Sequence, residues 1–178
     1  MLTVPMSVHI IIDGYNLIRR SARLSLLDRQ DIEQGREALV DMLAAYKKFK
    51  AHRITVVFDG ARAVPFSPQR NRHKGISIQF SRGAQSADDV IIKMARKEGP
   101  KALVVSSDRQ IVHAASAAGA ATISSAEFED KLAMAAFTDG MDADRDAYEG
   151  WKPTTRKKGP GRRLPKRQRR NRARLRKL

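Results

Sequence analysis

The sequence predicts an α/β fold with a mostly parallel central sheet and helices on both of its faces. Short β-branched apolar runs recur between residues 8 and 123, and segments with helical periodicity separate them. The charge distribution adds a third observation, because residues 151–178 contain 14 of the 35 Lys and Arg and none of the 19 acidic residues. We therefore expect one domain over residues 1–150, with a net charge of +2, and a tail of +14 over residues 151–178.

Four apolar runs are predicted to be buried strands of the parallel sheet. They are apolar at consecutive positions and therefore on both faces, and they lie at residues 8–12, 54–58, 102–105 and 120–123. A fifth segment, residues 76–80, alternates apolar and polar side chains, which predicts a half-buried strand at the edge of the sheet. The pattern does not fix the order of the strands.

Helical spacing of apolar residues separates these runs. It predicts helices over residues 33–50, 87–97 and 109–118. The third of these is followed by Gly119, the residue type that most often ends a helix. Ser124 and Glu127 form a capping box that opens a last helix, to about residue 137, and residues 138–150 are an acidic connector.

Composition and missing motifs exclude several classes of protein. The chain has no cysteine, which excludes disulfide frameworks, thiolate zinc sites and a cysteine nucleophile. The first apolar run is too short for a signal peptide or a membrane span, so we expect a soluble, cytoplasmic protein without a membrane partner. The sequence also lacks a phosphate-binding Gly-Lys-Ser/Thr loop, a Gly-x-Gly-x-x-Gly turn and a Gly-x-Ser-x-Gly nucleophile motif.

Aspartates follow three of the predicted buried strands. Asp13, Asp59 and Asp108 each lie directly after such a strand or within three residues of it. The carboxyl ends of parallel strands share one edge of the sheet, where ligands bind at the point of strand-order reversal. Carboxylates in one cleft repel each other unless a cation neutralises them, and all-oxygen sites suit Mg²⁺ or Mn²⁺. Each aspartate alone is equally well explained as a turn or helix-capping residue.

A fourth carboxylate comes from the start of the helix predicted at residue 87. Ser86 is the expected N-cap, and Asp89 then stands at N3, where it completes a variant of the capping box. Asp88, at N2, is free to join the other carboxylates as a metal ligand. The alternative for Asp88 is a favourable interaction with the helix dipole.

Four short stretches, taken in order, resemble a known family. They are Ile12-Asp13-Gly14-Tyr15-Asn16, Val57-Phe58-Asp59, Ser86-Ala87-Asp88-Asp89 and Ser106-Ser107-Asp108. Over roughly residues 8–135 the chain resembles the NYN domain family, in the YacP-like branch of the PIN-like ribonucleases. The resemblance implies a three-layer, PIN-like Rossmannoid fold, an acidic metal-binding cleft and endonucleolytic cleavage of RNA. The basic tail lies outside the matched stretch.

The resemblance also implies roles for individual residues. Asp13, Asp88 and Asp108 match the family's acidic positions, Asp59 matches the position after the second strand, and Asn16 is the motif asparagine. Asp89 stands where relatives often carry Glu, which leaves its role open. We expect Asp13, Asp88 and Asp108 to be catalytic and to hold one or two Mg²⁺ or Mn²⁺ ions, with Asp59 as a further ligand or acting through water.

The expected reaction is hydrolysis of an RNA phosphodiester bond to 5′-phosphate and 3′-hydroxyl ends. The ions would activate water for in-line attack and stabilise the leaving oxygen. Asn16 is predicted to orient a water or a phosphate oxygen. Ser107 is predicted either to bind a phosphate or simply to cap the next helix.

Basic residues are predicted to hold the RNA backbone on either side of the cut. They follow the first and second strands, and the set is Arg19, Arg20, Arg62, Arg72 and Lys74, with Arg23 and Arg70 beside them. The alternative for these residues is solvated surface charge. With 6% aromatic residues, the chain offers little surface for stacking bases.

The tail is predicted to be disordered and to bind RNA. Gly and Pro interrupt its run of Arg and Lys, and it has too few apolar residues to fold alone. Its charge predicts salt-sensitive attachment to RNA or to the ribosome, with a targeting or solubilising role as the alternative. Two other functions remain open for the whole chain: a non-catalytic RNA- or ribosome-binding factor, and a nuclease that cuts DNA.

Overall fold

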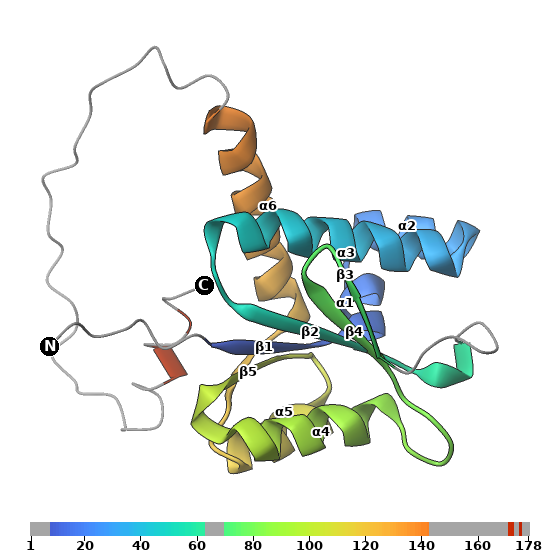
Figure 1. The fold of residues 1–178 in the computed structure, drawn as a ribbon, viewed down its shortest axis with the longest axis vertical. Coiled ribbons are helices and arrows are strands. Elements are labelled where there is room, and N and C mark those ends of the chain that lie inside the picture. Colours follow the sequence, from blue (N-terminus) through green and yellow to red (C-terminus); the bar gives the residue numbers. More distant parts are fainter. Residues whose placement is uncertain (1–7, 63–69, 143–170, 173–174, 176–178) are drawn as a thin grey trace, which may run out of the picture.

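The computed structural model describes residues 8–62, 70–142, 171–172 and 175. Within these residues six strands form one sheet (Figure 1): β1 (His9–Asp13), β2 (Arg53–Phe58), β3 (Arg70–His73), β4 (Ile76–Phe80), β5 (Ala102–Val105) and β6 (Ala121–Ile123). Their order across the sheet is β3-β4-β2-β1-β5-β6. Neighbouring strands are parallel except for the antiparallel pair β3–β4. The prediction of a mostly parallel sheet is confirmed.

Helices cover both faces of this sheet and give a three-layer architecture (Figure 1). One layer contains α1 (Gly14–Arg20), α2 (Ala22–Gln30), α3 (Ile32–Phe49) and α6 (Ser125–Asp142), and the other contains α4 (Ala87–Glu98) and α5 (Arg109–Ala117). Two short 3₁₀ helices, η1 (Gly60–Arg62) and η2 (Gly99–Lys101), complete the described elements.

The side chains on the two faces of the central strands belong to two separate apolar clusters. Ile10 and Ile12 of β1 pack into the cluster beneath α1, α3 and α6, whereas Ile11 packs into the cluster beneath α4 and α5. All three side chains are fully buried. The runs without alternation therefore belong to strands that helices cover on both sides, as their composition predicts.

A buried arginine joins the first helical layer to the sheet. Arg36 of α3 is 5% exposed and hydrogen-bonds the hydroxyl of Tyr15 through Nε (3.0 Å). Its guanidinium lies 5.5 Å from the ring centroid of Phe58 and 5.2 Å from that of Phe80. This cation–π arrangement fixes Tyr15 immediately beyond the carboxyl end of β1.

Gly14 allows the start of α1 to lie directly on β2. A Cβ atom at this position would stand 2.3 Å from the Phe58 ring and 2.9 Å from Val56. The Asp13-Gly14 pair is therefore a site of close helix–strand approach.

Three local expectations are wrong. Residues 14–30, for which no helix is expected, form α1 and α2, with Ser21 capping α2 by accepting from the Leu24 N–H. The segment 76–80 is an inner strand, because β3 pairs with its outer side through a two-residue turn at Lys74 and Gly75, both with positive φ. The last helix continues to residue 142, into the predicted connector.

Most of the basic tail lies outside the described residues. Of the part that is described, Asn171 accepts a hydrogen bond from the Thr122 backbone (3.1 Å) and Leu175 packs against the apolar cluster of the α1–α3 face. These two residues therefore contact the domain near the end of the tail. None of the helices in the described part of the chain combines the length and apolarity needed to cross a bilayer.

Candidate active site

The strand order reverses between β1 and β5. The chain leaves β1 through helices on one face of the sheet and leaves β5 through α5 on the other face. A crevice opens at the carboxyl ends of strands where this happens. Asp13 is the last residue of β1 and Asp108 follows β5 by three residues, so both belong to the switch point.

Asp13 is held by two hydrogen bonds from the surrounding backbone and side chains. Its Oδ1 accepts from the Asn16 N–H (3.3 Å), which makes it the N-cap of α1, and its Oδ2 accepts from the Ser106 hydroxyl (3.1 Å). Each carboxylate oxygen has further lone pairs. Capping and cation binding are therefore compatible in this side chain.

Asp108 is the N-cap of α5. Its Oδ1 accepts from the backbone N–H groups of Gln110 (2.7 Å) and Ile111 (3.2 Å), which leaves Oδ2 as the oxygen that can bind a cation. Its own N–H donates to Ser106 Oγ (3.1 Å). The alternative in which Ser107 caps this helix is wrong.

Asn16 ties three chain segments together. Its Oδ1 accepts from the Ser107 N–H (3.0 Å) and from the Ser125 hydroxyl (2.8 Å). Ser107 Oγ in turn accepts from the Ser125 N–H (3.2 Å). Because these bonds occupy the carbonyl oxygen of the amide, only the NH₂ group of Asn16 is available to a phosphate or a water.

Asp59 extends from the end of β2. Its Oδ1 accepts from the Ala61 N–H (3.0 Å) and from the Ser81 hydroxyl (3.4 Å). Ser81 Oγ also accepts from the Gly60 N–H (3.0 Å), so the ends of β2 and β4 are joined beneath this carboxylate.

Asp88 and Asp89 stand side by side at the start of α4 but have different surroundings. Asp89 completes the predicted capping box with Ser86: its Oδ2 accepts from the Ser86 N–H (3.0 Å) and hydroxyl (2.9 Å). These bonds hold the pKa of Asp89 below its usual value. Burial raises the pKa of Asp88, and the charges of Asp108, Asp89 and Asp59 raise it further.

Electrostatic repulsion links the carboxylates of this edge. The pKa of Asp13 is raised, first by burial and then by the charges of Asp88 and Asp108, against the lowering effect of its hydrogen bonds from Asn16 and Ser106. Within the described part of the chain, no Lys or Arg contributes to the pKa of Asp13 or of Asp88. The cluster therefore carries negative charge that the described residues do not compensate.

The donor set suits a hard divalent cation that keeps part of its water shell. Carboxylate oxygens are the ligands that Mg²⁺ and Mn²⁺ prefer, and Mg²⁺ commonly binds one or two of them with water in the remaining positions. Among the residues that the structure describes, no three acidic side chains lie close enough together to ligate one ion directly. A cation here would be bound by fewer than three carboxylates, with the others acting through water.

Four of the five predicted RNA-binding basic side chains lie in the described part of the structure. Arg19 and Arg20 are exposed in the last turn of α1, with Arg19 5.9 Å from the Tyr15 ring. Lys74 lies in the turn before β4, at the opposite edge of the sheet from the aspartates, where it pairs with Asp41 (2.5 Å). Arg72 pairs with Ser77 near the same end of β4.

The side chain of Arg62 lies outside the described part of the structure, as does that of Arg70. The contact of these five basic residues with the RNA backbone stays a prediction.

Sequence reasoning missed three serines that position the site. Ser106 bridges Asp13 and Asp108, Ser125 holds Asn16, and Ser81 supports Asp59. All three are buried. Ser106 directly follows β5, Ser81 directly follows β4 and Ser125 starts α6. These positions were the available signal, since buried hydroxyls at strand ends need polar partners.

Comparisons with known proteins agree with this architecture. The family model for the YacP-like NYN domain matches residues 10–177. The match therefore includes the basic tail, contrary to the expectation that the tail lies outside it. The uncharacterized protein YacP of Bacillus subtilis is 28% identical over 87 residues, which cover 49% of this chain and 51% of that protein. The aligned part thus spans about half the length of that relative.

Two solved structures share the fold. The crystal structure of Rae1 (YacP) from Bacillus subtilis aligns with a TM-score of 0.66 and 23% identity, covering 79% of this chain and 81% of that one. The crystal structure of its W164L mutant aligns with a TM-score of 0.63 and 22% identity, covering 79% and 86%. The chain belongs to the YacP-like NYN domain family.

Proposed function

We propose that this protein is a metal-dependent endoribonuclease that cleaves RNA phosphodiester bonds at the aspartate cluster. Membership of the NYN family supports nuclease chemistry in general. The observation that carries the specific proposal is the raised pKa of both Asp13 and Asp88 at the switch point of the sheet, with no basic side chain of the described residues to offset their charge. Such a cluster favours a divalent cation, and RNA needs one to approach it.

Residues of the chain have distinct parts in this proposal. Asp13, Asp88 and Asp108 would hold Mg²⁺ or Mn²⁺, at most two of them as direct ligands of one ion and the other, like Asp59, through water. The bound ion would supply Lewis-acid activation of water and neutralise the scissile phosphate. Ser106 holds Asp13 and Asp108 in position relative to each other, because its hydroxyl group hydrogen-bonds to both residues. The NH₂ group of Asn16 would donate to a phosphate oxygen while its carbonyl oxygen keeps the loops of β5 and α6 in place.

Substitutions of the neighbouring residues Asp88 and Asp89, in the first turn of α4, test the proposal. We expect Asp88→Asn to abolish cleavage of single-stranded RNA in Mn²⁺, because this carboxylate belongs to the cluster. Asp89→Asn is the matched control and should keep cleavage while lowering stability slightly, because it weakens only the capping box. Gel analysis of labelled RNA and of DNA with the same sequence measures both.

The outcomes of that assay separate the alternatives. Absence of cleavage by the wild type with any divalent ion, despite RNA binding, would leave a non-catalytic RNA-binding factor. Preferential cutting of the DNA strand would point to a DNA nuclease. Equal losses in the two variants would contradict the separate roles proposed for Asp88 and Asp89.

Metal binding can be tested without measuring activity. We expect Mn²⁺ to raise the Tm of the wild type by several degrees, since a ligand at about 100 times its Kd stabilises the folded state by about 2.7 kcal/mol. The Tm shift should be much smaller in an Asp13→Asn, Asp88→Asn double variant and unchanged in Asp89→Asn. Scanning calorimetry with Mn²⁺ and with EDTA measures it. An equal shift in all three proteins would place the bound ion elsewhere.

The basic tail supplies a second part of the proposal. Its charge of +14 suits the phosphates of RNA or of a ribosome, and the attachment would weaken steeply with salt. The contacts of Asn171 and Leu175 with the domain bring the tail's far end near β6. RNA bound by the tail would thus be held close to the nuclease domain.

A further inference from the structure

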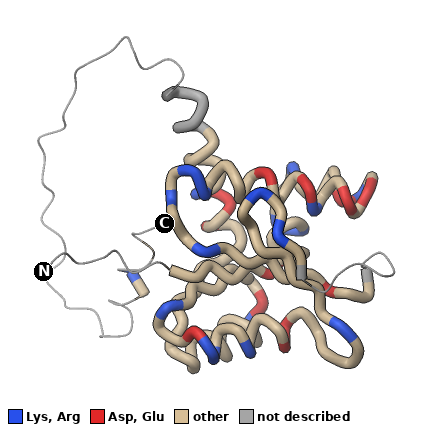
Figure 2. The backbone as a smooth tube through the Cα atoms, in the orientation of Figure 1, with Lys and Arg blue, Asp and Glu red and all other residues tan. Residues whose placement is uncertain are grey.

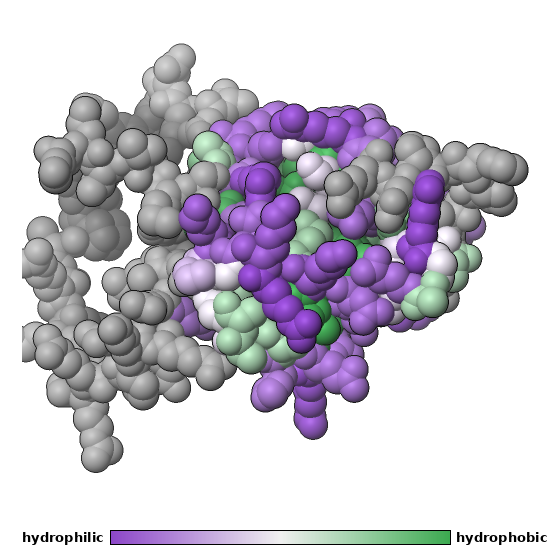
Figure 3. Space-filling model, turned by 60° about the horizontal axis from the view of Figure 1, so that its bottom comes forward, coloured by the Kyte–Doolittle hydropathy of each residue, from purple (hydrophilic) through white to green (hydrophobic). Residues whose placement is uncertain are grey.

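A polar groove lies on the α4 face of the sheet, between α4 and the β3–β4 hairpin. It has a volume of about 740 Å³. Lys93, Met94 and Lys97 line it from α4, and Arg72 and Gln79 line it from the hairpin. Figure 2 shows basic residues on both of these walls, and Figure 3 shows long hydrophilic side chains standing over this side of the molecule.

The strand positions beneath the groove are polar where a covered sheet would be apolar. Thr55 of β2 and Ser77 and Gln79 of β4 all line it. The same face becomes apolar under α4, where Ile11 and Val57 are fully buried. The apolar–polar alternation of residues 76–80 thus reflects a strand with one face in the core and one face in a groove, although the strand is not at the edge of the sheet.

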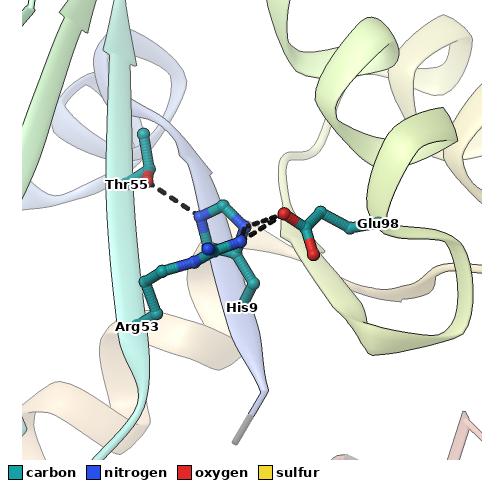
Figure 4. Close-up of polar contacts among 4 residues, drawn as sticks. All are labelled: His9, Arg53, Thr55 and Glu98. Atoms are coloured by element: carbon teal, nitrogen blue, oxygen red, sulfur yellow. Dashed lines mark hydrogen bonds and ion pairs between the residues drawn. The ribbon is translucent and has the colours of Figure 1, made fainter.

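The far end of the groove is closed by a cluster of four side chains (Figure 4). His9 hydrogen-bonds Thr55 Oγ1 through Nε2 (2.8 Å), and its Nδ1 lies 2.6 Å from Arg53 Nη2. Arg53 also pairs with Glu98. Burial and the Arg53 charge lower the pKa of His9, so Nδ1 of the neutral ring accepts from Arg53. Glu98 is the acidic residue of the lining, and this cluster already neutralises it.

The remaining basic side chains of the lining are not neutralised. In the described part of the chain, no acidic side chain is paired with Arg72, Lys93 or Lys97. Lys93 and Lys97 are exposed and four residues apart, so they stand on the same side of α4. The described part of the domain therefore has a cluster of carboxylates at one edge of the sheet and three positive charges without an acidic partner along this groove.

Helix α4 connects the groove to the aspartate cluster, although none of the four aspartates lines the groove itself. Gln85, which lines it, precedes Asp88 by three residues, and α4 runs from Asp88 along the groove to Glu98. A helix of this length extends for roughly 18 Å at about 1.5 Å per residue. That distance equals about five nucleotides of a stacked strand at about 3.4 Å per nucleotide.

We propose that this groove binds the sugar–phosphate backbone of the RNA strand that leads away from the scissile bond. The proposal rests on the proposed function, and its evidence is the charge of the walls and the course of α4, which holds Asp88 in its first turn and lines the groove further on. Arg72, Lys93 and Lys97 contact phosphates, while Ser77, Gln79 and Gln85 offer hydrogen bonds to ribose. Among the described residues that line the groove there is no Phe, Tyr or Trp, so these residues hold the strand without stacking of its bases and with little sequence preference.

Binding of a labelled single-stranded RNA 12-mer in EDTA tests the groove without any cleavage. The full-length double variant Lys93→Gln, Lys97→Gln should bind this RNA severalfold more weakly. The slope of the logarithm of the association constant against the logarithm of the salt concentration should become shallower by about 1.4, because each lost phosphate contact contributes about 0.7. The matched control is Arg29→Gln, Lys131→Gln, which removes the same charge from α2 and α6 and should keep the wild-type slope. Equal effects of the two double variants would overturn the proposal, as would competition by oligoglutamate as strong as by RNA.

Cleavage of two substrates separates this proposal from the proposed function. With Mn²⁺, the Lys93→Gln, Lys97→Gln variant should lose kcat/KM on the 12-mer and keep kcat. It should cut a dinucleotide, which is too short to extend from the aspartates to Lys93 and Lys97, at the wild-type rate. Unchanged kcat/KM on the 12-mer, with cleavage intact, would refute the groove alone. Failure of the wild type to cut either RNA would refute the proposed function and leave the binding measurement to decide on the groove.

Discussion

Asp13→Asn is expected to reduce RNA cleavage more than about a hundredfold, since even the loss of an outer-shell partner of a metal ligand costs about 10–100-fold. Asparagine keeps the size of the side chain and an Oδ1 that can accept from the Asn16 N–H. Its NH₂ group can donate to Ser106 Oγ in place of the present bond to Oδ2. The change therefore removes the charge and leaves the cap of α1 in place, and initial rates in Mn²⁺ measure the loss.

The same substitution should leave the Tm unchanged or raise it at neutral pH in EDTA. The pKa of Asp13 is raised in the folded protein, chiefly by burial, so the ionised carboxylate disfavours the fold. Its destabilising effect appears as the pH rises through the window between the unfolded pKa and the raised folded pKa. The Tm of Asp13→Asn minus that of the wild type should thus increase from pH 4 to pH 7.

Calorimetry over this pH range, on both proteins, provides the check. A variant that cuts RNA at the wild-type rate would remove Asp13 from the site. A Tm that falls sharply on substitution, at every pH, would show that Asp13 is mainly a structural cap and that loss of activity reflects unfolding.

Gly14→Ala is expected to destabilise the protein by about 1–3 kcal/mol, although alanine favours a helix by about 1 kcal/mol over glycine. The added Cβ would overlap the Phe58 ring at 2.3 Å, and that ring is 1% exposed and packed edge-on against Tyr15. For a chain of this size the Tm should fall by roughly 2–4 °C per kcal/mol. Denaturation in urea measures the change in free energy of unfolding.

A double-mutant cycle with Phe58→Leu shows whether the overlap is the cause. Phe58→Leu alone should destabilise the protein by leaving space, and alanine at position 14 should fill part of that space. The two substitutions together should therefore be less destabilising than the sum of the single changes. Strict additivity would contradict the overlap. Gly83→Ala, at a glycine with φ +62 and no atom near its Cβ, is a control that shows only the effect of backbone strain.

The long apolar runs predicted the central strands because burial on both faces leaves a simple pattern. Residues 54–58 fall within β2, and residues 102–105 are the whole of β5. The capping boxes at Ser86 and Ser124 were equally readable, since each depends on two residues three positions apart. The order of the strands depends on contacts between distant segments, and no local pattern contains it.

The hairpin of β3 and β4 shows why other elements were missed. β3 contains no apolar residue, and its turn uses Lys74-Gly75 where Asn-Gly would have been a clear signal. α2 likewise has a single buried residue, Leu24, and little apolar periodicity. At the site, the four aspartates could be predicted from their positions after strands and at a helix start. The bond from Ser125 to Asn16 could not, because 109 residues separate the two.

That long-range bond has a consequence for the timing of synthesis. The aspartates come from four separate segments, and the loop of the first motif is clamped only when the start of α6 is present. A chain that is still being translated has Asp13 early but lacks Asp108 and the clamp until about two thirds of its length has been made. On the proposed function, a growing chain cannot cut RNA until most of the domain has left the ribosome.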